Sequence, residues 1–420
     1  MTTSYKHRLL RFRTGLIHKA AASFLPVEKP VLFTGPSASE QLCQIIQYHG
    51  HGKVMIVTDE VLVKLGVIAP IQQALEENNL EVCVFSEVEP DPTDKVVVKG
   101  ADVFSQNNCD CVLAVGGGSS IDAAKTIASL ASNPGLTVTD LASTLKVKKR
   151  AKNVYTIPTT SGTGSEVSVA AVISDAISHE KTIISVQGMM PLAAAIDTNI
   201  VKGMPASVTA ATGMDAMTHA IEAFISESAS PESDYYAKAA IVMIMENLPK
   251  AYHDGNDIKA RELMGIAAFY AGFAFSKALL GYVHSISHRL SKNYGTPHGL
   301  ANALVLPHVL EFSKDVVEER FVQLMKAIDK KGSEGKSSQA LAQQFIDRIT
   351  ALNREVGIPA TLDKLKEADI PEIAEAALKE AHFLYAVPKY MDEEECQQVV
   401  RCLLPVAETA AVVDEGAVTA

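Results

Sequence analysis

The first part of the chain alternates short apolar runs with helix-forming stretches, and this alternation restricts the fold more than any other feature. The apolar runs are rich in Val, Ile and other strand formers and lie at 31–34, 53–59, 81–86, 111–115 and 154–158. Helices are predicted between them near 60–79, 93–107 and 120–132. Continuous apolar strands separated by helices are typical of a parallel sheet covered on both faces. We therefore expect an α/β domain that binds its ligand at the carboxyl ends of the strands.

After about residue 200 the chain becomes rich in Ala, Leu, Ile, Met and Glu, with apolar residues at helical spacing. Helices are predicted over 207–227, 235–248, 258–276, 277–292, 302–312, 315–330, 337–355, 371–380 and 393–409. The sequence thus predicts two domains with a boundary at Met204-Pro205. The first, over 1–204, is an α/β domain with an N-terminal extension over 1–28. The second, over 205–420, is an all-helical domain.

The overall composition excludes several classes of protein. With 420 residues, of which 47% are hydrophobic, the chain can bury large cores. A formal net charge of −11 argues against nucleic-acid binding, which requires clustered Lys and Arg. No apolar run approaches the ~20 residues of a membrane span. Six cysteines without a CxxC pair predict reduced thiols in a cytoplasmic protein.

The N-terminus is basic, since five Lys and Arg residues precede Glu28, the first acidic residue. Transit peptides have such a composition, but they are also usually Ser-rich. An amphipathic surface helix with Leu9, Leu10 and Phe24 on its apolar side is therefore the favoured interpretation of this segment.

A glycine-rich turn follows the apolar run at 111–115 and leads into a predicted helix, with the sequence Gly116-Gly117-Gly118-Ser119-Ser120. Glycines let the backbone approach a diphosphate, and the helix beyond offers free N–H groups and the positive end of its dipole. A plain turn capped by Ser or by Asp122 is the alternative. Three glycines and two serines in this context favour phosphate binding.

Two further features suggest contacts to a nucleotide. Asp59 ends an apolar run, where a carboxylate can accept hydrogen bonds from ribose hydroxyls and repel a 2′-phosphate. It can equally cap the following helix, and both roles are compatible. A second polar loop, with the sequence Thr159-Thr160-Ser161-Gly162-Thr163-Gly164-Ser165-Glu166, carries five hydroxyls. We expect this loop to contact a ribose or a phosphate, although an ordinary turn with a Ser-x-x-Glu cap would have the same sequence.

A cluster of histidines lies in the predicted helical domain. Asp215 and His219 are four residues apart, as are His284 and His288, so each pair lies on one helix face with Cβ atoms roughly 5–6 Å apart. His298 follows at a break between helices. Imidazoles and a carboxylate suit iron, zinc and similar divalent ions. Asp215 lies among apolar residues, where an unpartnered carboxylate is costly, so a metal site is favoured over a surface pair.

Taken together, these motifs resemble those of the iron-containing, or group III, alcohol dehydrogenase family. The resemblance rests on the two polar loops, on Ala211-Thr-Gly-Met-Asp215-Ala-Met-Thr-His219-Ala-Ile-Glu222, on His284-x-x-x-His288, and on Thr296-Pro-His298-Gly299-x-Ala-Asn302, and it extends from about residue 28 to 410. It implies a dehydroquinate-synthase-like architecture and a homodimer. It also implies that the domain over 1–204 binds a dinucleotide and that the helical domain over 205–420 holds a metal ion and the substrate.

The resemblance also implies roles for individual residues. Asp215, His219, His284 and His298 match the family's metal ligands, and His288 matches a histidine beside the nicotinamide and substrate. Asp59 matches the residue linked to NAD preference over NADP. The turn over Gly116–Ser119 matches the pyrophosphate site, and nucleotide contacts are matched by Thr159, Thr160 and Thr163. The expected cofactor-binding set is completed by Ser120, Asp122, Ser165 and Lys181.

Two positions depart from the family pattern. Arg289 stands where Pro is common, and Ser291 stands where Gly is common. Arg289 either binds an anionic group on the substrate or faces solvent, and solvent is the favoured interpretation because Arg is seldom buried unpaired.

The expected function is reversible hydride transfer between a primary alcohol or aldehyde and NAD, with NADP as the alternative coenzyme. Fe(II) is the expected metal and Zn(II) the alternative, and His288 is the candidate proton relay. A zinc polyol dehydrogenase of the glycerol type is the first rival. A dehydroquinate-synthase-like lyase is less favoured, because only Lys181, Lys292 and Arg289 are cationic near the expected site. A non-catalytic metal-binding protein would need neither polar loop.

Overall fold

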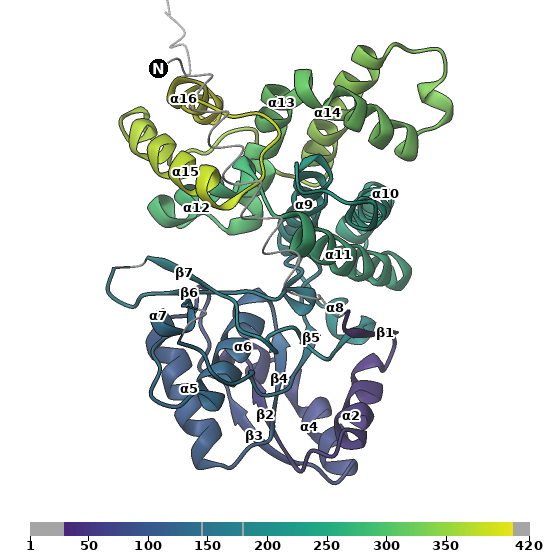
Figure 1. The fold of residues 1–420 in the computed structure, drawn as a ribbon. Coiled ribbons are helices and arrows are strands. Elements are labelled where there is room, and N and C mark those ends of the chain that lie inside the picture. Colours follow the sequence, from purple (N-terminus) through teal and green to yellow (C-terminus); the bar gives the residue numbers. More distant parts are fainter. Residues whose placement is uncertain (1–28, 144–145, 179, 406–420) are drawn as a thin grey trace, which may run out of the picture.

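The computed structural model describes residues 29–143, 146–178 and 180–405. An α/β half forms the lower part of Figure 1, and a helical half lies above it. The α/β half is built on a sheet of six strands in the order β1-β8-β5-β4-β2-β3. These strands are β1 (Val31–Gly35), β2 (Lys53–Val57), β3 (Glu81–Phe85), β4 (Cys111–Gly116), β5 (Val154–Pro158) and β8 (Ala193–Asp197). Every neighbouring pair is parallel, which confirms the predicted sheet.

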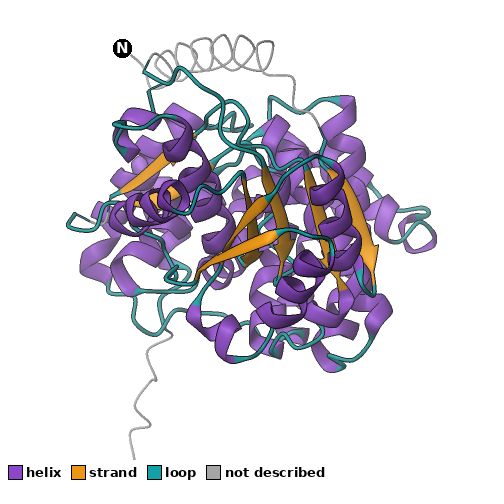
Figure 2. Cartoon of the chain, turned by 90° about the horizontal axis from the view of Figure 1, so that it is seen from below, coloured by secondary structure: helices purple, strands orange, loops and turns teal. Residues whose placement is uncertain are grey.

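Helices cover both faces of this sheet (Figure 2). In β4, Leu113 and Val115 join one apolar core with α2 (Ala38–Tyr48) and α4 (Ile68–Glu77). Val112 and Ala114 join a second core with α5 (Asp94–Gln106) and α6 (Gly118–Ser132). Because alternate residues of one strand face two different cores, the strand must be apolar throughout. This packing explains the uninterrupted apolar runs of the sequence.

The helical half surrounds a buried central helix, α9 (Ala206–Ile225), which packs against α10, α11 and α13. The helices of this half are α10 (Pro231–His253), α11 (Ile258–Ala278), α12 (Tyr282–Tyr294), α13 (His298–Ile328), α14 (Ser338–Glu355), α15 (Ile370–Leu384) and α16 (Glu393–Arg401). Because α9 is covered on several sides, small and apolar residues dominate it, and its polar side chains are candidates for function.

Arg261 fixes the start of α9 relative to the rest of the helical half. The residue is 1% exposed, and its guanidinium donates to Thr209 Oγ1 at 2.6 Å, to the Met204 carbonyl at 2.9 Å and to the Gly255 carbonyl at 3.1 Å. These bonds tie α11 to the connection between the two halves. The predicted domain division at Met204-Pro205 falls in this connection, just before α9, and stays a prediction.

Several predicted elements differ from the structure. The helix predicted over 60–79 is two helices, α3 (Glu60–Lys64) and α4, since Gly66 has a φ of 76° between them. The helices predicted over 302–312 and 315–330 are one helix, α13, with a kink at Val317. The helix predicted from 277 begins only at Tyr282.

Other elements were absent from the prediction. They are α2, the short helices α7 (Val138–Leu141) and α8 (Thr198–Val201), strand β8, and the antiparallel pair β6 (Ala171–Ser174) and β7 (Lys181–Ile184). Strand β8 has the sequence Ala-Ala-Ala-Ile-Asp, and Ala is depleted in strands elsewhere, so its local sequence gives no strand signal.

Two predictions concern residues outside the described ranges. These are the N-terminal extension over 1–28 and the last residues, 406–409, of the helix predicted over 393–409. That prediction is too long, because the helix ends at Arg401 and residues 402–405 are not helical. Within the described ranges, no single helix has the length and hydropathy of a membrane span. Only α11 and α12 taken together pass such a test, by length and composition, and they are bent by 107°.

Candidate active site

The glycine-rich turn lies where β4 ends and α6 begins, at the carboxyl edge of the sheet. Neighbouring strands β2 and β4 send their helices to opposite faces there, which is the position where open parallel sheets bind ligands. A Cβ on Gly116 would collide with Ser120 Oγ, and a Cβ on Gly118 would lie 3.0 Å from Thr163 Cγ2. The turn therefore requires glycine, and it brings the amino end of α6 to the surface of the site.

The second polar loop lies directly against this turn. The Thr159 N–H donates to the Gly116 carbonyl at 3.0 Å, and a Cβ on Gly117 would lie 3.6 Å from Thr160 Oγ1. Thr160 Oγ1 and Ser161 Oγ are buried, and neither has a hydrogen-bond partner among the described residues. Buried hydroxyls normally find a partner, so this pair of loops fits the ribose and phosphate groups of a nucleotide.

Asp122 and Ser165 hold the two loops together. Ser165 Oγ donates to Asp122 Oδ1, and the Val172 N–H donates to Asp122 Oδ2 at 2.9 Å. The buried Lys125 ammonium donates to Ser165 Oγ, Ser168 Oγ and the Ala170 carbonyl at 2.9 to 3.1 Å. Burial lowers the pKa of Lys125 to about 8. Asp122 and Ser165, expected to bind the cofactor, are thus placed to support the loops that would contact it.

The other two predicted cofactor residues lie at the same edge of the sheet. Asp59 follows β2 and caps α3, with its Oδ1 accepting from the Leu62 N–H at 2.9 Å, so the capping role is present. Lys181 lies on β7, and its Nζ is 3.3 Å from Asp91 Oδ1. The Asp91 N–H in turn donates to Ser119 Oγ at 3.4 Å. The fold therefore places the Lys181 ammonium and the Asp91 carboxylate close to the glycine-rich turn.

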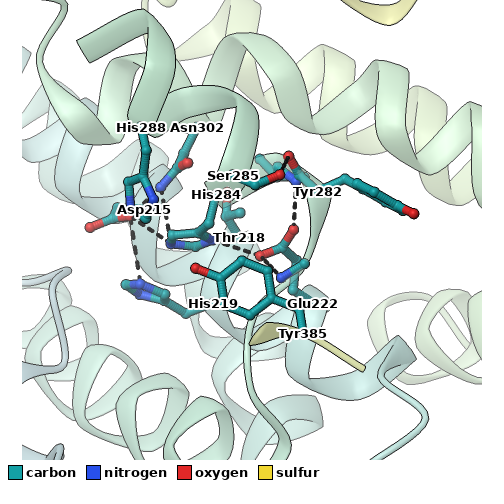
Figure 3. Close-up of polar contacts among 12 residues, drawn as sticks. Asp215, Thr218, His219, Glu222, Tyr282, His284, Ser285, His288, Asn302 and Tyr385 are labelled. Atoms are coloured by element: carbon teal, nitrogen blue, oxygen red, sulfur yellow. Dashed lines mark hydrogen bonds and ion pairs between the residues drawn. The ribbon is translucent and has the colours of Figure 1, made fainter. Parts of the chain in front are cut away.

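The candidate metal ligands come from α9, α12 and α13, and Figure 3 shows Asp215, His219 and His284 close to one another. The ligand atoms of Asp215, His284 and His298 all lie within 4.8 Å of one another. Asp215 Oδ1 lies 3.9 Å from His284 Nε2 and 3.6 Å from His298 Nε2. His219 is outside that tight set, but its Nε2 lies 3.8 Å from the same carboxylate oxygen. All four predicted ligands are thus brought together.

The chemistry of these side chains suits a divalent ion. Burial lowers the pKa of both His284 and His298 well below the usual value, so both imidazoles are neutral and can donate a lone pair. The amide nitrogen of Asn302 donates to Asp215 Oδ1 at 2.7 Å and lies 3.2 and 3.1 Å from the Nε2 atoms of His284 and His298. Three imidazoles and a carboxylate, of which Asp215, His284 and His298 are held together by a buried amide, fit iron or zinc.

The candidate metal cluster adjoins the second polar loop, over 159–166, which is the candidate nucleotide loop. His219 Nδ1 lies 3.2 Å from the Gly162 carbonyl, so the loop accepts the hydrogen bond that orients this imidazole. A Cβ on Gly162 would collide with the Thr212 carbonyl of α9. Because residue 162 has no side chain, the loop can pack directly against α9. The predicted nucleotide site and the predicted metal site are therefore in direct contact.

His288 lies beside the cluster, and its ring stacks on that of His298 with centroids 5.3 Å apart. Its Nδ1 is 2.7 Å from Glu380 Oε1 of α15. Arg289 Nη2 pairs with Glu380 Oε2 at 2.6 Å, and the Arg289 side chain is 27% exposed. The expectation that Arg289 faces solvent is therefore wrong, because a carboxylate on a distant helix provides the partner that burial requires.

Three residues at this site were given no role in the sequence analysis. Glu222 contacts His284, Glu380 contacts His288, and Asn302 contacts Asp215. Glu222 and Asn302 lie inside the motifs that carried the family resemblance. Their positions within predicted helices could have indicated that they lie near the candidate ligands. Glu380 is 92 residues from His288 and had no such signal.

Comparisons with known proteins cover nearly the whole described chain. Residues 30–198 match the family described as iron-containing alcohol dehydrogenase, and residues 209–404 match the C-terminal part of the Fe-containing alcohol dehydrogenase family. The chain is 37% identical to the NAD-dependent methanol dehydrogenase of Bacillus methanolicus over 85% of this chain and 93% of the relative. It is also 37% identical to the 1,3-propanediol dehydrogenase of Citrobacter freundii, over 88% and 96%. A crystal structure of 1,3-propanediol oxidoreductase aligns with a TM-score of 0.85 at 36% identity, over 90% of this chain and 99% of that one.

Proposed function

Because the chain belongs to the iron-containing alcohol dehydrogenase family, we propose that it interconverts primary alcohols and aldehydes, with NAD as coenzyme and Fe(II) as metal. Family membership makes the protein an NAD-dependent, metal-dependent alcohol dehydrogenase. In the oxidative direction an alcohol and NAD⁺ give an aldehyde, NADH and one proton. The finer points, namely the residue roles, iron over zinc, NAD over NADP and the substrate class, are proposals.

One observation carries the proposal most directly: the metal cluster and the nucleotide loop are in contact through His219 and Gly162. An alcohol oxygen placed at the cluster would have its carbon facing the edge of the sheet where the two polar loops lie. Hydride transfer needs this juxtaposition of the reacting carbon and the nicotinamide.

Asp215, His219, His284 and His298 would hold the ion. When bound, the ion supplies a Lewis acid for the alcohol oxygen, and the nicotinamide accepts the hydride from the alcohol carbon. The turn over Gly116–Ser120 would bind the pyrophosphate through its N–H groups, and Lys181 adds positive charge nearby. His288 has one ring nitrogen engaged by Glu380, so the other nitrogen is the one that can take the hydroxyl proton.

The proposal is tested by metal analysis of anaerobically purified protein together with NADH oxidation against a panel of short aldehydes. We expect about one iron per chain and turnover with at least one aldehyde. Bound zinc with preferential oxidation of glycerol would favour the polyol alternative. Absence of both metal and turnover, even after addition of Fe(II) or Zn(II), would mean that the histidine cluster is structural.

Coenzyme choice is tested at Asp59. Asp59→Gly should raise the NADP/NAD ratio of kcat/KM by about tenfold or more, because the carboxylate would no longer repel a 2′-phosphate. Gly also weakens the cap of α3 by a few tenths of a kcal/mol. Asp59→Asn is the matched variant, since Asn caps as well as Asp but carries no charge. If neither variant changes the ratio, measured by initial rates with both coenzymes, Asp59 does not face the ribose.

The oligomeric state and the cellular location of the protein are also proposals. The homodimer follows from the family resemblance alone. A cytoplasmic location is supported by the six cysteines, which are all free thiols.

A further inference from the structure

The two histidines of α12 are each bonded to a carboxylate from another helix. His284 Nδ1 lies 2.6 Å from Glu222 Oε2, and Glu222 is on α9. His288 Nδ1 lies 2.7 Å from Glu380 Oε1, and Glu380 is on α15. In Figure 3 the His284 ring lies between Asp215 on one side and Glu222 on the other. One helix thus carries two imidazoles that are held from behind by two different carboxylates.

Both contacts determine which ring nitrogen faces the site. An ionised carboxylate offers only acceptor positions, so each Nδ1 carries the proton when Glu222 and Glu380 are ionised. The lone pair then lies on Nε2. For His284 this nitrogen is 3.9 Å from Asp215 Oδ1, on the side of the ring that faces the cluster. The carboxylates therefore set both the tautomer and the rotation of the two rings.

The two carboxylates have different surroundings. Glu222 is 3% exposed, and its oxygens also accept from the Gly281 N–H at 2.9 Å and the Val283 N–H at 2.7 Å. It therefore fixes the first turn of α12, and His284 with it. A Cβ on Gly281 would lie 2.8 Å from Glu222 Oε1, so this position leaves room for the carboxylate only as glycine.

Among the residues that the structure describes, Glu380 accepts hydrogen bonds from side chains only. Besides His288, it accepts from Tyr385 Oη at 2.9 Å and from Arg289 Nη2 at 2.6 Å. Burial alone would raise the pKa of Glu380, but the bonds from His288, Arg289 and Tyr385 lower it to about 2. Arg289 is one of the two departures from the family pattern. It thus fixes the Glu380 carboxylate, which in turn fixes His288.

We propose that the two carboxylates are positioning residues with separate tasks: Glu222 sets the metal affinity through His284, and Glu380 sets the productive orientation of His288. The inference rests on the proposed function, because it takes His284 as a metal ligand and His288 as the group that faces the substrate. A carboxylate behind a metal-bound imidazole typically contributes 10–100-fold to metal affinity. No such dependence is expected for Glu380, since His288 is not among the proposed ligands.

The test compares two isosteric variants, Glu222→Gln and Glu380→Gln, each as the control for the other. Zn(II) affinity of the metal-free full-length chain is measured by competition with a chromophoric chelator. Glu222→Gln should weaken Zn(II) binding about 10–100-fold, because its amide must face at least one N–H donor. Glu380→Gln should bind Zn(II) within about twofold of wild type. With saturating Fe(II), the kcat of Glu380→Gln should fall about tenfold or more, while its KM for NADH changes less than about twofold.

A second variant tests the role of Glu222 in case Glu222→Gln does not fold. Gly281→Ala keeps the carboxylate but displaces it, and should weaken Zn(II) binding in the same direction. Wild-type affinity for Zn(II) in both Glu222→Gln and Gly281→Ala would overturn the role of Glu222. Equal loss of affinity in Glu222→Gln and Glu380→Gln, or an unchanged kcat in Glu380→Gln, would overturn the division of tasks. Failure of the proposed function gives a different pattern, in which wild type and His284→Ala bind Zn(II) equally weakly.

Discussion

His284→Ala is expected to leave the protein with less than about a tenth of its bound metal and to lower kcat/KM by about 1000-fold. His284 is 1% exposed and belongs to the set of three residues whose ligand atoms lie within 4.8 Å of one another. Alanine removes one of the two imidazoles of that set. Lewis-acid stabilisation of the developing charge is worth several kcal/mol, and each 1.36 kcal/mol corresponds to tenfold in rate.

The measurement is metal content by elemental analysis after anaerobic purification, followed by aldehyde reduction rates with added Fe(II). His308→Ala is the matched control. His308 is also a partly buried histidine, whose pKa is lowered by burial, but it lies ten residues beyond His298 on α13, outside the cluster. We expect the control to keep about one metal ion per chain. Wild-type metal content in His284→Ala would remove this residue from the ligand set.

The fold should survive His284→Ala. Loss of the imidazole leaves Glu222 with two of its three hydrogen-bond donors, the N–H groups of Gly281 and Val283, which costs about 1–3 kcal/mol. A circular dichroism spectrum like that of wild type would separate loss of the ligand from loss of the helical half.

The features that could be predicted from the sequence are those with a local physical signature. Asp215 and His219 lie one helical turn apart, so their convergence follows from helix geometry alone. The glycine-rich turn follows a strand and opens a helix, and its place at the edge of the sheet follows from the chain direction. The apolar run of β4 shows its burial on both faces directly.

The features that could not be predicted depend on contacts between distant parts of the chain. The partner of His288 comes from α15, which lies against α12 only in the folded protein. The same contact decides the conformation of Arg289, which no local pattern could reveal. Strand β8 is a strand because it is paired between β1 and β5, although its alanines favour helix by themselves.

Gly272→Ala is expected to destabilise the protein by about 3 kcal/mol, against its local helical preference. In the interior of a helix, Ala is more favourable than Gly by up to about 1 kcal/mol. In this structure, however, a Cβ on Gly272 would lie 2.6 Å from Gly164 Cα and 2.8 Å from the Gly164 carbonyl oxygen. Helix α11 therefore approaches the backbone of the nucleotide loop so closely that neither position tolerates a side chain. Gly164 has a φ of 62°, so its backbone is already in the left-handed region and has little freedom to adjust.

The same collision should weaken coenzyme binding, because Gly164 lies in the loop that carries Thr160 and Ser161. We expect the dissociation constant for NADH, measured by fluorescence titration, to rise about tenfold, which corresponds to ~1.4 kcal/mol. Gly213→Ala in α9 is the matched control. Its Cβ would meet the terminal methyl groups of Leu248, which can move, instead of backbone atoms. If Gly272→Ala is as stable as Gly213→Ala in urea unfolding and binds NADH like wild type, the close approach of α11 does not set the position of the loop. If only Gly272→Ala loses both stability and NADH affinity, a contact between two glycines fixes the position of the candidate nucleotide loop relative to the helical half.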